Sequence, residues 1–416
     1  MDKATTEAKR PRAAFTPYQK FVIAVLAFLQ FTIILDFMII SPLGAMMMPT
    51  LHINPQQFGL AVSSYAFSAG ASGLLAAGFA DRFDRKRLLL FFYVGFMLGT
   101  LLCALAATYP MLLMARIVTG LFGGVIGSVV LAIATDLFPL EMRGRVMGFI
   151  QTAFAASQVL GLPAGLFFAN HWDWHAPFVA IIAVAVPAGV VILFFMKPVA
   201  AHLTLTQEHS PLMHLAHTLA EPRYRLAFIL TMLLPTGGYM LMPFGTAFIV
   251  NNIGLSIHTL PTIYLVTGLC TVFVGPLVGR ASDSFGKFNT FCFGTLMTLV
   301  MVAVWTNLGH EPLAVVILIN VLLFIGIFSR MIPSQALLSA IPEITKRGAF
   351  NAVSASLQQV AGGVSAAIAG AVIVEMPGGT LGHFNWLGYI VMAVALVSLA
   401  LMYFVHKAVP EPAPRG

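Results

Sequence analysis

The sequence alternates long apolar blocks with short clusters of lysine and arginine, and this alternation restricts the fold more than any other feature. Residues 21–80 hold one charged side chain, Asp36, and residues 88–135 hold one, Arg116. Each block is long enough for two membrane-spanning helices of about 20 residues with a turn between them. The blocks are residues 21–80, 88–135, 146–196, 226–279, 288–342 and 348–406. The sequence therefore predicts an all-α membrane protein with twelve transmembrane helices.

The positions of the cations predict how these helices are oriented. Of the 22 lysines and arginines, all but Arg116 and Arg330 lie in the two tails or between the apolar blocks. Cytoplasmic loops of membrane proteins carry the excess of lysine and arginine. We therefore expect a multi-pass protein of the bacterial cytoplasmic (inner) membrane with both termini in the cytosol. No cation lies in the expected outer turns, which are residues 49–55, 108–110, 169–177, 251–261, 307–312 and 376–384.

Composition excludes several other classes of protein. Hydrophobic residues make up 59% of the chain and charged residues 9%, whereas soluble domains are about a quarter charged. The excess positive charge behind the net charge of +7 lies in the loop clusters and the two tails, so we expect contact with the lipid bilayer and none with nucleic acid. The three cysteines lie in apolar runs and indicate neither disulfides nor a metal site. No phosphate loop, zinc spacing or nucleophile elbow occurs, so we expect neither enzymatic activity nor a cofactor.

A charged motif occurs twice, about half the chain apart. Residues 77–87 read AGFADRFDRKR, and residues 279–287 read GRASDSFGK. When Asp81 is aligned with Asp283, both copies have a phenylalanine two residues later and a cation four residues later. Such a repeat indicates two pseudo-symmetric six-helix halves. The expected units are a cytosolic tail at 1–20, an N-terminal half at 21–197, a cytosolic connector at 198–224, a C-terminal half at 225–406 and a cytosolic tail at 407–416.

The first copy resembles the loop motif between the second and third helices of the major facilitator superfamily, and the second copy resembles the weaker repeat of that motif. The resemblance extends over the whole chain and implies the twelve-helix fold of secondary transporters. In the family, glycine usually stands where this sequence has Ala77 and Asp84. We expect the chain to work as a monomer.

The motif implies a cytosolic latch between the two halves. In the family, the aspartate matched by Asp81 meets the N-terminus of the eleventh helix, which is expected here just after residues 346–348, and a carboxylate is favoured at that positive helix end. By symmetry, Asp283 would face the start of the fifth helix. Arg85 resembles the family arginine that pairs with an acid at the end of the fourth helix, here Asp136. The alternative is that these charges only set the topology. The expected latch residues are Asp81, Arg82, Arg85, Asp136, Arg280 and Asp283.

Asp36 is the one acidic residue well inside a predicted span. An ionised carboxylate costs several kcal/mol inside a membrane, so this side chain should take up a proton or meet a cation. Arg116 on the fourth predicted helix is the expected partner, and the spacing from Arg116 to Gly120 resembles a motif of proton-coupled family members. We therefore expect Asp36 and Arg116 to carry proton coupling, with a permanently paired structural acid as the alternative.

Two further regions are candidates for substrate handling. The fifth predicted helix contains Gly161, Pro163 and Gly165, and partly resembles the antiporter motif of drug-efflux members. Proline bends a helix and glycine permits close packing, so we expect a hinge there. Arg330 on the tenth predicted helix would bind an anionic substrate group or pair within its own half. The other cavity candidates, which would otherwise face lipid, are Tyr239, Met242 and Phe244 on the seventh predicted helix.

These patterns favour a secondary active transporter that works by alternating access. The leading hypothesis is proton-coupled efflux of a small hydrophobic, drug-like or sugar-like compound. An importer that moves a small organic solute together with protons is the first alternative. A non-transporting membrane receptor or scaffold is the second, although the chain leaves no room for a sizeable soluble domain.

Single cysteines at Asn54, His258 and Gly379 should react with an impermeant thiol reagent added to intact cells, because all three positions lie in expected outer turns. A cysteine at Gln207, in the expected cytosolic connector, should react only after the cells are opened. The measurement is labelling of single-cysteine variants in a background that lacks the native cysteines. Labelling at Gln207 in sealed cells would show that the predicted orientation is wrong.

Overall fold

The computed structural model describes residues 15–76, 79–200, 203, 211–343 and 347–408, with the backbone alone at Asp81, Leu140 and residues 211–214. Within these residues, twelve helical spans are long and apolar enough to cross a membrane, which confirms the predicted all-α fold. The spans are α1 (Pro17–Thr50), α2 (Pro55–Ala76), α3 (Arg85–Ala104), α4 (Tyr109–Leu137), α5 with η2 and α6 (Leu140–Ala156, Ser157–Gly161, Leu162–His171), α7 (Ala176–Phe195), α9 with α10 (Arg225–Leu233, Thr236–Asn251), α11 (Leu260–Phe285), α12 (Lys287–Trp305), α13 (Leu313–Ser339), α14 (Arg347–Val372) and α15 (Phe384–Ala408).

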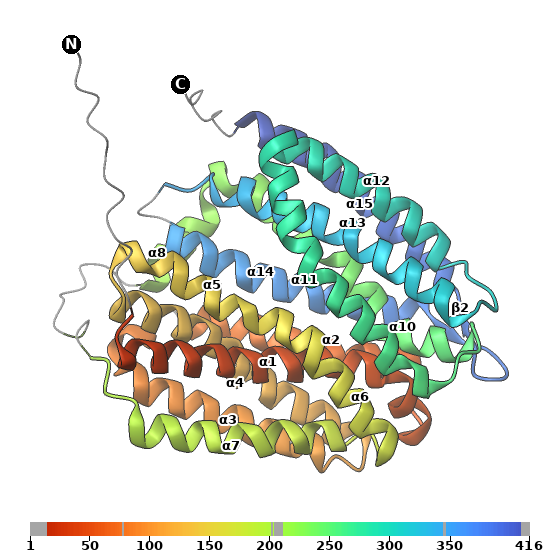
Figure 1. The fold of residues 1–416 in the computed structure, drawn as a ribbon, viewed down its shortest axis with the longest axis horizontal. Coiled ribbons are helices and arrows are strands. Elements are labelled where there is room, and N and C mark those ends of the chain that lie inside the picture. Colours follow the sequence, from red (N-terminus) through yellow and green to blue (C-terminus); the bar gives the residue numbers. More distant parts are fainter. Residues whose placement is uncertain (1–14, 77–78, 201–202, 204–210, 344–346, 409–416) are drawn as a thin grey trace.

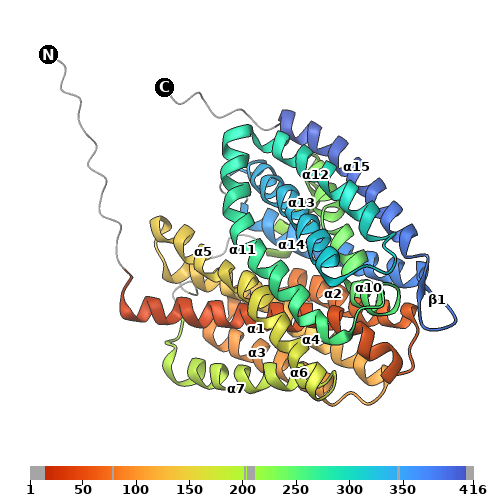
Figure 2. The same cartoon turned by 45° about the vertical axis from the view of Figure 1, so that its right-hand side comes forward.

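The helices lie side by side, and both ends of the described chain lie at the same end of the bundle (Figure 1). We call this the inner end, because the sequence predicts that it faces the cytosol, and we call the opposite end the outer end. The spans from α1 to α7 form one half and those from α9 to α15 form the other (Figure 2). The two halves expected from the sequence are therefore present, whereas the residue limits of the predicted units stay a prediction.

Short elements join the spans. A short helix occupies part of the connector before α9. The outer turn after α14 contains a two-stranded antiparallel hairpin, which the sequence does not predict. Gly378 and Gly379 close this hairpin with φ angles of 94° and 81°, a conformation that glycine adopts readily. The short elements are η1 (Ala80–Arg82), α8 (Pro211–Ala220), η4 (Pro222–Tyr224), η5 (Ile257–Thr259), β1 (Val374–Glu375) and β2 (Leu381–Gly382).

The fifth span changes its helical winding next to Pro163. Pro163 has no N–H to donate to the carbonyl of Val159, and the residues before it form the π-helical turn η2. α11 crosses the chain at this turn, because a Cβ at Gly268 would lie only 3.1 Å from the carbonyl oxygen of Gln158. The irregular turn therefore sits where the two halves meet.

The glycines on either side of Pro163 pack against α1. A Cβ at Gly161 would lie 2.6 Å from Leu35, and a Cβ at Gly165 would lie 2.6 Å from Ile39. The close packing expected for these glycines is therefore present. The hinge motion expected for the segment stays a prediction.

α2 and α14 join the two halves along a contact that we call the glycine seam, formed by Gly59 and Gly70 of α2 and Gly370 of α14. A Cβ at Gly59 would lie 2.7 Å from the carbonyl oxygen of Ala366 and 3.0 Å from the Cα of Gly370. A Cβ at Gly70 would lie 2.9 Å from Val360. Helices in lipid associate through such close packing, because lipid provides no hydrophobic driving force between them. The seam therefore sets how closely the halves approach.

Gly59→Ala should destabilise the protein by about 1–3 kcal/mol, because the added methyl group must push α14 away from α2. The measurement is the midpoint of thermal unfolding of the full chain in detergent. Gly127→Ala is the matched control, since a Cβ at Gly127 on α4 meets no atom within 4 Å. Equal midpoints for the two variants would show that α2 and α14 are not in close backbone contact.

Candidate functional site

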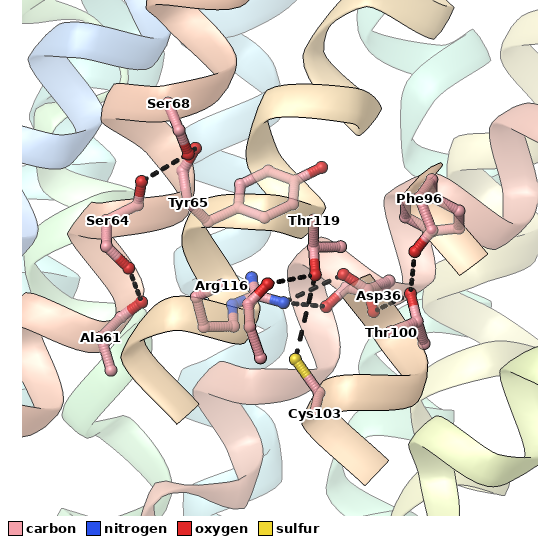
Figure 3. Close-up of polar contacts among 11 residues, drawn as sticks. Asp36, Ala61, Ser64, Tyr65, Ser68, Phe96, Thr100, Cys103, Arg116 and Thr119 are labelled. Atoms are coloured by element: carbon pink, nitrogen blue, oxygen red, sulfur yellow. Dashed lines mark hydrogen bonds and ion pairs between the residues drawn. The ribbon is translucent and has the colours of Figure 1, made fainter. Parts of the chain in front are cut away.

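Asp36 and Arg116 form a fully buried ion pair between α1 and α4 (Figure 3). Nη1 of Arg116 donates to Oδ2 of Asp36 at 2.9 Å, and neither side chain has any exposed surface. Arg116 lies about 10 Å along α4 from its outer end, so the pair is inside the span. The partner that the sequence predicts for Asp36 is thus the one present, and its role in proton coupling stays a prediction.

α3 supplies a third polar group to this site. The hydroxyl oxygen of Thr100 lies 3.1 Å from Oδ1 of Asp36 and 3.0 Å from the carbonyl oxygen of Phe96 (Figure 3). α3 packs tightly on α4 because Gly99 has no side chain, and a Cβ there would lie 2.6 Å from Oγ1 of Thr119. Sequence reasoning missed Thr100, although a hydroxyl group within an apolar helix is a signal that could have found it.

Arg116 has few acceptors besides Asp36. Its guanidinium carbon lies 4.5 Å from the centre of the Tyr65 ring, a favourable cation–π contact. Its Nε and Nη2 atoms are buried and have no hydrogen-bond partner among the described residues. The arginine is therefore held by one strong hydrogen bond and one aromatic face, which leaves several of its five N–H donors unused.

Phe37, the residue after Asp36, extends the site towards the other half. Its ring centre lies 5.1 Å from that of Tyr65 and 5.8 Å from that of Tyr239 on α10. The Tyr239 hydroxyl donates to Oε1 of Gln359 on α14 at 2.7 Å. Aromatic contacts thus join the ion pair in one half to Tyr239, a predicted cavity residue, in the other.

A cavity of about 10 Å³ lies between the halves, with roughly the room of one water molecule. Met242 lines it as predicted, whereas Phe244 is fully buried against Phe58 and belongs to the core in this structure. Sequence reasoning missed Gln158 and Thr267 on the cavity wall, and polar residues inside apolar spans were the available signal. Oγ1 of Thr267 has no partner among the described residues. The other lining residues are Met38, Leu162, Tyr264, Gly268 and Phe324.

Contacts between the halves close the outer end. The Asn170 side chain at the end of α6 donates to the carbonyl oxygen of Ile257 at 3.4 Å. The Thr246 hydroxyl on α10 donates to the carbonyl oxygen of Ser41 on α1, also at 3.4 Å. Both hydrogen bonds are long, so they hold the outer end weakly.

Arg85 joins the described part of the first charged motif to the end of α4. Its Nε donates to Oδ2 of Asp136 at 3.1 Å, and its Nη1 donates to the carbonyl oxygen of Ala80 at 3.0 Å. Asp84, which stands where the family has glycine, is the N-cap of α3 and accepts a hydrogen bond from the N–H of Arg87 at 2.9 Å. The φ angle of Asp84 is −55°, so glycine is not required there.

Among the described side chains, Arg82, Arg280 and Asp283 make no hydrogen bond or ion pair with the opposite half. The side chain of Asp81 lies outside the described residues, so its contact with α14 stays a prediction. Arg82, Arg280 and Asp283 are exposed, and Asp283 makes no hydrogen bond or ion pair with another described residue. The inner ends of α5 and α11 lie apart in both views (Figure 1, Figure 2), which accounts for the absence of the contact expected for Asp283.

Arg330 on α13 is the second cation inside a span. Only 7% of its surface is exposed, and its Nε has no partner among the described residues. Its guanidinium carbon lies 5.8 Å from the centre of the Phe291 ring. Arg330 makes no ion pair within the described part of its half, so an anionic substrate group stays the open alternative. No cluster of three or more histidine, cysteine or acidic residues in the described ranges could hold a metal ion.

Comparisons with known proteins agree with this fold. The sequence matches the family model described as Major Facilitator Superfamily over residues 26–362 and 227–416. YceJ, an uncharacterized MFS-type transporter of Bacillus subtilis (strain 168), is 25% identical over 64% of this chain and 68% of its own length. Multidrug resistance protein 3 of the same organism is 32% identical over 34% of this chain and 27% of its own length. A solved D-xylose–proton symporter superposes with a TM-score of 0.77 at 17% identity, covering 94% of this chain and 98% of that chain.

Asp36→Asn should destabilise the protein more than Arg116→Gln. Loss of Asp36 leaves Arg116 charged and buried, at a cost of about 3–5 kcal/mol, because arginine does not give up its proton. Loss of Arg116 leaves a carboxylate that can become neutral by binding a proton, so this variant should also be more stable in acidic than in alkaline buffer. Thermal unfolding midpoints of both variants measure this. The reverse order of stability would mean that Arg116 finds another partner.

Proposed function

The chain belongs to the major facilitator superfamily, and we propose that it couples the transport of a small molecule to the movement of protons through Asp36. Membership of the family makes it a multi-pass membrane protein and a secondary transporter, not an enzyme. The receptor or scaffold alternative therefore has no support. Proton coupling, direction of transport and substrate class are the proposed parts.

The observation that carries the proposal is the sealed Asp36–Arg116 pair, in which both side chains are fully buried. A buried ion pair gives little stability, because removing two charges from water offsets their attraction. Ionisable residues inside a membrane more often serve function. Asp36 can be charged while it is paired or neutral while it is protonated, and a proton-coupled carrier requires alternation between two such forms.

Alternating access provides the route by which a proton reaches Asp36. The pair is sealed in this structure, so exchange of protons requires a second conformation in which the halves have rocked apart at the outer end. Proton binding would release Arg116 from Asp36. The contacts of Phe37 with Tyr65 and Tyr239 support transmission of this change to the other half.

For the direction of transport we propose efflux of a small hydrophobic, drug-like or sugar-like compound. The similarity to multidrug resistance protein 3 supports this direction, as does the partial antiporter motif around Pro163. Tyr239 and Met242 would contact the substrate between the halves, and Arg330 would meet an anionic group if the substrate carries one. Import with protons is the alternative. Proton movement opposite to the substrate in vesicles supports efflux by antiport, and movement in the same direction supports import.

We also propose that the protein works as a monomer in the bacterial cytoplasmic (inner) membrane, with both termini in the cytosol. The two charged loops would act as a latch at the inner end. The Arg85–Asp136 pair supports this role for the first loop. Asp283 would reach the positive start of α5 when the inner ends of α5 and α11 come together.

Asp36→Asn should abolish transport driven by a pH gradient, because asparagine resembles the protonated acid and cannot release a proton. Exchange of substrate down its own gradient should survive, since it requires no net proton movement. The measurement uses proteoliposomes and a compound identified by growth and accumulation screening of a deletion strain. Glu375→Gln in the exposed outer hairpin is the matched control and should transport like the wild type.

A variant that still concentrates substrate with protons would show that Asp36 is not the proton carrier and that the acid is structural. Loss of both driven transport and exchange, in a protein that still unfolds cooperatively, would instead mean that Asp36 is needed for the conformational change itself.

A further inference from the structure

Thr100 lies between two acceptors but has one proton to donate. Its hydroxyl oxygen is 3.1 Å from Oδ1 of Asp36 and 3.0 Å from the carbonyl oxygen of Phe96, one helical turn earlier. A threonine hydroxyl donates one hydrogen bond and accepts up to two. An ionised Asp36 can only accept hydrogen bonds, so the Thr100 hydroxyl donates its one hydrogen bond to Asp36. The carbonyl oxygen of Phe96 then keeps only the backbone hydrogen bond of the helix.

The same three atoms also fit a protonated Asp36. The neutral carboxyl gains an O–H donor. Thr100 then turns its hydrogen to the carbonyl oxygen of Phe96 and accepts the hydrogen of Asp36 on its lone pair. This exchange needs rotation about one C–O bond and no movement of a heavier atom. The one covalent change is the new O–H bond on Asp36, whose proton comes from solvent in the open conformation.

We propose that Thr100 is a positioning residue that holds Asp36 in both protonation states. The site can then close around the protonated carboxyl group without a bound water. This inference rests on the proposed function. Asp36 and Thr100 are both fully buried in this structure, so solvent cannot replace the threonine hydroxyl once the site has closed. A site without that hydroxyl would leave the acidic O–H of Asp36 with no acceptor.

Within the described residues, Arg116 is the one charged side chain that Asp36 faces. Tyr65 on α2 and Cys103 on α3 are the other titratable neighbours, and a phenol and a thiol are neutral near pH 7. When Asp36 takes up a proton, Arg116 loses its carboxylate partner and keeps the Tyr65 ring at 4.5 Å. After the pair separates, Thr100 thus still contacts Asp36 and Tyr65 still contacts Arg116.

Infrared difference spectra of the full chain in liposomes, recorded between acidic and alkaline buffer, test this inference with the proton as the only ligand. A protonated-carboxyl band that is present in the wild type and absent from Asp36→Asn belongs to Asp36. In Thr100→Val this band should move to higher wavenumber, because the acid loses its acceptor. Its appearance after a pH jump should slow about tenfold, as expected for one lost hydrogen bond. Thr100→Ser keeps the hydroxyl and should resemble the wild type.

Thr295→Val is the matched control. Thr295 on α12 is also fully buried and donates to the carbonyl oxygen one turn earlier, that of Phe291, at 2.8 Å. Within the described residues Thr295 makes no hydrogen bond to a carboxylate, so its replacement should leave the Asp36 band unchanged. If Thr100→Val does not fold, Thr100→Ala takes its place in the comparison with Thr100→Ser.

Two results would contradict the inference in different ways. An Asp36 band with the same position and rate in wild type, Thr100→Val and Thr100→Ala would overturn the role of Thr100 and leave the proposed function standing. A wild type without any Asp36-dependent carboxyl band would show that Asp36 does not bind a proton, and would overturn both.

Discussion

A charge inside hydrocarbon is costly without a partner, and this cost organises the N-terminal half around Asp36 and Arg116. The two residues come from α1 and α4, and their contact at 2.9 Å fixes how those helices meet. α3 must then approach closely enough for Thr100 to reach the carboxylate, which the missing side chain of Gly99 permits. The polar site and the packing of three helices therefore depend on one another, because a buried ion pair gives little stability alone and close packing of the helices holds its members in contact.

Charge placement made the fold predictable from the sequence. Hydrocarbon excludes lysine and arginine, so their clusters mark the ends of the spans and the apolar blocks between them give the number of helices. The same exclusion made Asp36 and Arg116 conspicuous, since each is the lone charge in its block. Their pairing followed because few other residues in the N-terminal spans could neutralise either charge. The Arg85–Asp136 contact was predictable through the family motif rather than through elementary physics.

Features that depend on how helices cross one another were not predictable. The π-helical turn η2 shifts the faces of the fifth span by an amount that the position of Pro163 alone does not give. Apolar spans are hydrophobic on every side, so periodicity does not show which face meets a neighbour. For that reason Phe244 was expected on a cavity and lies in the core, while Gln158 and Thr100 were missed. Asp84 stands where the family usually has glycine, and its role as the cap of α3 was missed because that role depends on the conformation of one residue.

The glycine seam between α2 and α14 has a mechanical consequence for a molecule whose halves must rock. Interdigitated side chains resist rotation of one helix against another, because each side chain must change rotamer before its neighbour can pass. Gly59 and Gly370 meet through backbone atoms alone, so no side chain at these two positions has to rearrange. The seam can therefore serve as a contact about which the two halves rotate. Opening of the outer end would then have to break the polar contacts between the halves away from the seam, such as that between Asn170 and Ile257.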